Sequence, residues 1–183
     1  MHESGHYTVA RALGFETGHC AIVVNFGNAH RGESEITLPV GLRSMSEISA
    51  YLERRVMVLY AGALAEGLGK NVIDKKRALK ALKEGGEQDH AKVRELVNVI
   101  RNIRHPDTPL EDAQKELDAI DHELWNKAAE KVLSERTVIS KLATVLVSKV
   151  TSYEQLTRME RSEIEAITEF QERFSRPRTH RRS

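Results

Sequence analysis

The chain has 183 residues, of which 40% are hydrophobic, 30% charged and only 5% aromatic. This length suits one packed domain, and the composition excludes collagen-like, mucin-like and wholly disordered proteins. Because 28 Lys and Arg oppose 27 Asp and Glu, the formal net charge is +1, and we expect no nucleic-acid partner. Residues 175–183 contain four arginines and no acid, which predicts a disordered basic tail.

A single cysteine, Cys20, cannot form an internal disulfide, which fits a reducing compartment. Every apolar stretch is interrupted by a charge or a glycine before it reaches the roughly 18 residues that a bilayer span needs. We therefore expect a cytoplasmic protein without a membrane span.

The N-terminal part is expected to contain a short helix, two strands and a long helix. A helical spacing of apolar residues predicts the first helix, and a β-branched run bounded by glycines predicts the first strand. Ser44 and Glu47 form a capping-box pattern at the start of the long helix. In chain order the four elements span residues 2–13, 20–26, 35–38 and 45 to Gly67 or Gly69.

The remaining elements are all expected to be helices. Asp74 is a candidate N-cap, and Thr108 and Pro109 offer a cap and a first helical residue. The expected helices span residues 75–82, 87–103, 109–132 and 138–150, with one or two short helices within 153–167. The whole pattern predicts a mainly α fold with a small two- or three-stranded sheet near the N-terminus.

The first predicted helix carries an H-E-x-x-H motif, in which the outer residues are His2 and His6. Since these histidines are one turn apart, both imidazoles lie on one helix face and can bind a single Zn²⁺. The same face continues into apolar residues and therefore points toward the core, where an unpaired histidine pair costs free energy. Glu3 lies beside the pair and suits a general base acting on a zinc-bound water.

A catalytic zinc site with two histidines needs a third protein ligand. Two inward-facing acids are candidates. Asp89 shares a helix face with apolar residues at 93, 96 and 100, and Glu66 lies at the end of the long helix. The pattern alone leaves both acids open.

Four segments in fixed order resemble the landmarks of a known family. They are His-Glu-Ser-Gly-His at 2–6, Glu-Ser-Glu-Ile-Thr-Leu-Pro at 33–39, Leu-Tyr-Ala-Gly-Ala-Leu-Ala-Glu at 59–66 and Gly-Gly-Glu-Gln-Asp-His at 85–90. This order is similar to that of the peptidase domain of FtsH-type ATP-dependent zinc metalloproteases. The resemblance covers most of residues 1–170.

The resemblance implies a helical zincin-like peptidase domain over 1–170, in which 1–86 hold the motif helix, sheet and long helix. The helical bundle over 87–170 then carries Asp89 as the third zinc ligand. Glu66 is implied to lie near the ligand histidines without binding the metal, and the strand over 35–38 to line the substrate cleft. No P-loop pattern occurs in the sequence, so we expect no ATPase activity from this chain.

The predicted function is zinc-dependent hydrolysis of peptide bonds in unstructured polypeptides, with Glu3 as general base. A separate ATPase or self-association is a candidate partner. Two alternatives remain: a catalytically idle zinc-binding helical adaptor, and a regulatory peptidase that cuts one specific partner. Because His2 directly follows Met1, we also expect the natural protein to extend upstream.

Overall fold

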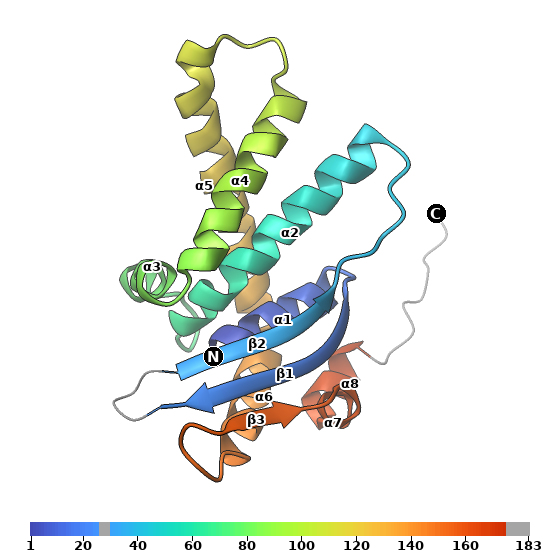
Figure 1. The fold of residues 1–183 in the computed structure, drawn as a ribbon, viewed down its shortest axis with the longest axis vertical. Helices are drawn as coiled ribbons and strands as arrows, with labels where there is room; N and C mark the ends of the chain where they lie inside the picture. Colours follow the sequence, from blue (N-terminus) through green and yellow to red (C-terminus); the bar gives the residue numbers. More distant parts are fainter. Residues whose placement is uncertain (26–29, 175–183) are drawn as a thin grey trace.

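A computed structural model describes residues 1–25 and 30–174, and the predicted basic tail at 175–183 lies outside them (Figure 1). In the described part, helices dominate and a small three-stranded antiparallel sheet accompanies them, which confirms the expected fold class. The elements are α1 (His2–Ala12), β1 (Glu16–Val24), β2 (His30–Thr37), α2 (Met45–Glu66), α3 (Lys75–Glu84), α4 (Glu87–Arg104), the short 3₁₀ helix η1 (Leu110–Asp112), α5 (Ala113–Ser134), α6 (Arg136–Ser148), β3 (Leu156–Met159), α7 (Arg161–Glu165) and α8 (Thr168–Phe174).

The sheet has the order β2-β1-β3, so β1 is central and pairs antiparallel with both neighbours. β1 and β2 each begin earlier than expected, at Glu16 and His30. The expectation of only helices within 153–167 was wrong, because Leu156–Met159 pair with residues 20–23 of β1. This pairing joins segments far apart in the chain, and no local pattern of four residues reveals it.

Side-chain caps fix the start of two helices as expected. The Ser44 hydroxyl accepts a hydrogen bond from the backbone N–H of Glu47 at 3.1 Å and caps α2. In a capping box the Glu47 carboxylate would accept a hydrogen bond from the backbone N–H of Ser44. It accepts instead from the backbone N–H of Arg43, one residue before. Asp74 caps α3. The helix expected from Pro109 instead opens with η1, and α5 follows it.

Helix α2 is central to the molecule and contacts α1, α3, α4 and α5. α1 approaches α2 closely at Gly5, where a Cβ atom would lie 2.5 Å from the carbonyl oxygen of Ala61. The other side of α1 contacts the sheet, so α1 is held between α2 and the sheet. None of the helices in the described part of the chain is long and apolar enough to cross a membrane.

Candidate metal centre

Three side chains from two helices converge beside α2. His2 and His6 come from the first turns of α1, and their ring centroids lie 4.7 Å apart. Asp89 comes from the first turn of α4, and its Oδ2 lies 3.0 Å from His6 Nε2 and 3.6 Å from His2 Nε2. One ligand atom from each residue lies within 4.8 Å of the other two. Among the residues that the structure describes, no other group of three offers such a metal site.

The backbone of α2 fixes the orientation of His6. The imidazole is 7% exposed, and its Nδ1 lies 2.7 Å from the carbonyl oxygen of Val58. A carbonyl can only accept, so the Nδ1–H donates and Nε2 is directed toward Asp89. Metal-ligating histidines in proteins are held by the same kind of contact.

A glycine in the middle of α2 makes room for both imidazoles. A Cβ atom on Gly62 would lie 2.3 Å from His6 Nε2 and 2.6 Å from His2 Nε2. Real Cβ atoms do not approach nitrogen so closely, so any larger residue at this position displaces the two rings. Gly62 therefore leaves space at the nitrogens that a metal would use.

The three side chains form a charged cluster. Burial disfavours ionisation of Asp89, but hydrogen bonds from His2 and His6 outweigh it and hold the pKa of Asp89 far below its ordinary value. Burial alone lowers the pKa of His6, but the Asp89 carboxylate outweighs it and raises this pKa above 6.5. Both shifts favour an ion pair between the His6 ring and the Asp89 carboxylate, and a divalent cation bound there would displace a proton from the ring.

Glu3 is held against the sheet beside the cluster. Its Oε2 accepts a hydrogen bond from Ser34 Oγ, 2.8 Å away on β2. Its stem crosses Gly32, where a Cβ atom would lie 2.2 Å from Glu3 Cγ. The carboxylate is therefore oriented by β2 and lies outside the group of three candidate ligands.

The Glu66 carboxylate contacts backbone groups at the first turn of α1. Its Oε1 accepts the N–H of His2 at 2.9 Å and lies 3.6 Å from the α-amino nitrogen of Met1. A carboxylate at this position satisfies a free N–H and opposes the positive end of the helix dipole. Glu66 thus supports the helix that carries the histidines, and the structure brings Asp89 and not Glu66 to their ring nitrogens.

Three residues of the site were missed by sequence reasoning, namely Val58, Gly62 and Ser34. Only Gly62 left a signal, because a glycine inside a long helix lowers its stability and calls for a packing reason. The carbonyl of Val58 and the hydroxyl of Ser34 acquire their roles from contacts across 52 and 31 residues of sequence.

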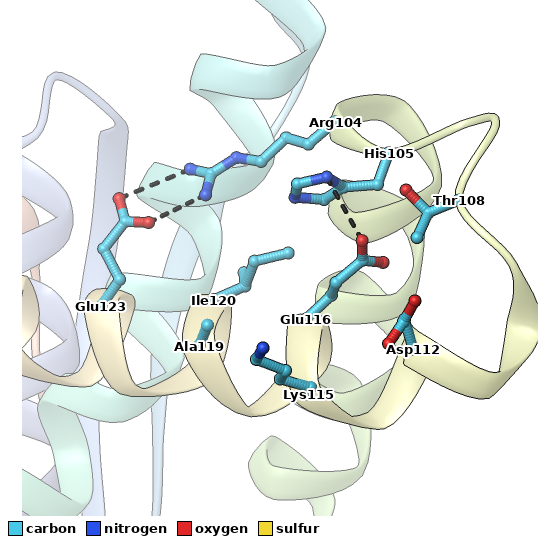
Figure 2. A pocket seen from close by; sticks show the side chains of 9 residues that line it. All are labelled: Arg104, His105, Thr108, Asp112, Lys115, Glu116, Ala119, Ile120 and Glu123. Atoms are coloured by element: carbon cyan, nitrogen blue, oxygen red, sulfur yellow. Dashed lines mark hydrogen bonds and ion pairs between the residues drawn. The ribbon is translucent and has the colours of Figure 1, made fainter.

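A separate pocket of about 430 Å³ lies between the end of α4 and the first turns of α5 (Figure 2). Four of its side chains form two pairs: Arg104 binds Glu123 at 2.8 Å, and His105 Nδ1 lies 3.5 Å from Glu116. None of the candidate metal ligands lines it. The pocket therefore adds nothing to the chemistry of the metal centre.

Comparison with known proteins gives no family model that matches the chain and no curated protein that matches it. The fold and the site define a mainly helical protein with a candidate centre of two histidines and one aspartate. The likeness to FtsH-type peptidase domains rests on the four ordered motifs.

Proposed function

We propose that the chain is a zinc-dependent metalloendopeptidase that acts on unstructured polypeptides. The observation that carries this proposal is the convergence of His2, His6 and Asp89, with Glu3 next to the first of them. Two imidazoles and one carboxylate are a donor set of catalytic zinc sites, which keep the fourth position open. Gly62 presents no side chain to the ring nitrogens, where a Cβ atom would lie 2.3 and 2.6 Å from them. When bound, zinc activates a water molecule and polarises the scissile carbonyl.

In this proposal Glu3 moves the protons. Its carboxylate takes a proton from the attacking water and later delivers it to the leaving amine. The hydrogen bond from Ser34 orients the carboxylate and leaves Oε1 to accept the proton. Val58 holds His6 in the tautomer that presents Nε2, and Glu66 fixes the first turn of α1.

The position of β2 supports an extended substrate. Among the described strands β2 pairs only with β1, so its other edge has no strand partner there. A polypeptide can add to such an edge through main-chain hydrogen bonds, which requires an unfolded segment and little sequence preference. Because Glu3 rests on this strand, the added segment would pass close to the base.

The deciding experiment measures bound zinc and hydrolysis of a casein-like unfolded protein in three proteins. The unmodified protein should bind one zinc ion and cleave the substrate. Glu3→Gln should keep the metal and lose at least a hundredfold in rate, which is the contribution of general base catalysis. Asp89→Ala should lose both metal and activity. The absence of zinc from the unmodified protein would refute the proposal, and loss of zinc in Glu66→Ala but not in Asp89→Ala would refute the ligand assignment.

The same measurement separates the alternatives. Zinc without turnover of any polypeptide indicates an idle zinc-binding adaptor, and turnover of one partner only indicates a regulatory peptidase. A folded substrate must be unfolded before it can be cleaved, so we propose a separate ATPase in the cytoplasm as a partner. Self-association of the chain is the other candidate.

A further inference from the structure

One arginine lies on the face of α2 that borders the metal centre. Successive residues of a helix are rotated by about 100° around its axis, so Arg55 and four other α2 residues lie on one face that is about 80° wide. The contacts of those four residues show which parts of the molecule this face packs against. The four residues are Tyr51, Val58, Gly62 and Glu66.

These four residues contact α1 and the chain that leaves β2. Val58 accepts from His6, Gly62 borders both imidazoles, and Glu66 accepts from the N–H of His2, as described above. Tyr51, one turn before Arg55, donates its hydroxyl to the carbonyl oxygen of Leu38 at 3.1 Å. Leu38 directly follows β2. Arg55 therefore lies between the metal centre and the end of the edge strand.

Arg55 is partly buried. Within residues 1–25 and 30–174, no hydrogen bond or ion pair engages it. Burial lowers its pKa, and the negative charge of Asp89 acts in the opposite sense, so the group lies within electrostatic range of that carboxylate. Asp89 is itself committed to the two histidines.

Its neighbour Arg54 is also partly buried, but it has internal hydrogen-bond partners. Arg54 donates to the carbonyl oxygens of Ala50 and Leu13 at 3.2 and 3.3 Å, and it covers the ring of Phe15. Its role is explained by packing and capping, which makes it a matched control for Arg55.

The spacing along α2 gives the distance from the metal centre. Arg55 precedes Gly62 by seven residues, which is about 10 Å at 1.5 Å per residue. An extended polypeptide advances about 3.3 Å per residue and covers that distance in about three residues. A guanidinium recognises a carboxylate through two parallel hydrogen bonds, and a partly dehydrated one gains most from doing so.

We propose that Arg55 is a specificity residue that binds a carboxylate of the polypeptide about three residues from the cleaved bond. The inference deepens the proposed function and rests on it. The carboxylate belongs either to an acidic side chain or to the C-terminus of the substrate. Both present the same fork of oxygen atoms, and the experiment separates them.

The test measures binding of short fluorescein-labelled neutral peptides to the zinc-loaded Glu3→Gln protein by fluorescence anisotropy. One Glu is placed at successive positions and compared with Gln at the same position. We expect the Glu peptide to bind about tenfold more tightly at one position, as for a hydrogen bond between charged groups. Arg55→Gln should abolish the difference, Arg55→Glu should favour Lys over Glu, and Arg54→Gln should change neither.

Equal binding of Glu and Gln peptides at every position would overturn the proposal, and so would a preference that Arg55→Gln retains. Peptides with a free or an amidated C-terminus distinguish the two sources of the carboxylate. If Arg55→Gln does not fold, Arg55→Lys carries the test, because it keeps the charge and must keep a weaker preference. Failure of the unmodified protein to cleave casein would refute general cleavage of unstructured polypeptides, whereas the binding preference is measured independently of cleavage.

Discussion

At the scale of single residues, Gly62 sets the space beside the two imidazoles that would bind the proposed metal. Gly62→Ala places a methyl group 2.3 Å from His6 Nε2 and 2.6 Å from His2 Nε2, so both rings must move. We expect zinc affinity to fall at least tenfold, as for other changes beside metal ligands. Competition with a chromophoric chelator measures it.

The control for that variant is Gly41→Ala, since a Cβ atom at Gly41 meets nothing within 4 Å. Its zinc affinity should equal that of the unmodified protein. Unchanged zinc affinity in Gly62→Ala would contradict the prediction, because it would show that both imidazoles can move aside and still bind the ion.

The reactivity of the Cys20 thiol tests the burial of a single residue. The thiol is buried on the central strand, and burial raises its pKa to about 12. Since only the thiolate reacts, the native protein at about pH 8 should be inert to a disulfide reagent, and reaction should appear only upon unfolding. Spectrophotometric titration before and after addition of guanidinium chloride measures this. Rapid stoichiometric reaction of the native protein would contradict the burial of β1.

The candidate ligands and the candidate base of the centre could be predicted from the sequence better than the residues that orient them. His2, Glu3 and His6 are close in sequence, so helix geometry alone places them together. The choice of Asp89 over Glu66 depends on which helix end reaches the imidazoles. That is a property of the packing of α1, α2 and α4, and the pattern of either acid on its own helix could not decide it.

At the scale of elements, an ion pair joins α8 to the junction of α5 and α6. Glu135 is 1% exposed, and Arg173 from α8 donates to both of its oxygens at 2.6 and 2.7 Å. Arg173→Ala leaves a buried charge without a partner, and we expect a loss of about 3 kcal/mol in the free energy of unfolding. Urea denaturation followed by circular dichroism measures it.

A double variant tests the cause of that loss. Adding Glu135→Gln to Arg173→Ala removes the buried charge, and we expect it to restore part of the lost stability. If the double variant is less stable than Arg173→Ala, the loss comes from the packing of the arginine stem and not from the stranded carboxylate.

Elements that carry their own start signals could be predicted, and those that depend on a distant partner could not. Ser44 and Asp74 mark the beginnings of α2 and α3 within a few residues of sequence. β3 has no such signal, since its four residues form a strand only because β1 offers them a free edge. Its Arg158 and its exposed Leu156 give no alternation that marks a buried face.

At the scale of the whole molecule, the proposed metal would join the first turns of α1 and α4. An ion that binds only the folded state stabilises it by about 4 kcal/mol when free zinc exceeds its dissociation constant a thousandfold. For a chain of this size we expect a rise of about 10 °C in the melting temperature, reversed by a chelator. Differential scanning calorimetry measures it. Asp89→Ala should melt at the same temperature with and without zinc, and a zinc-dependent shift in that variant would place the ion elsewhere.

The three-stranded sheet also imposes an order on biosynthesis. β1 and β2 leave the ribosome before β3, the second neighbour of β1, which lies more than a hundred residues later in the chain. Until β3 emerges, β1 has one open edge, and the hairpin that contains the strand orienting Glu3 is a two-stranded sheet in contact with α1. A nascent chain that already carries every candidate ligand thus still lacks the third strand, so the sheet beside the centre is completed only after α6 has been synthesised.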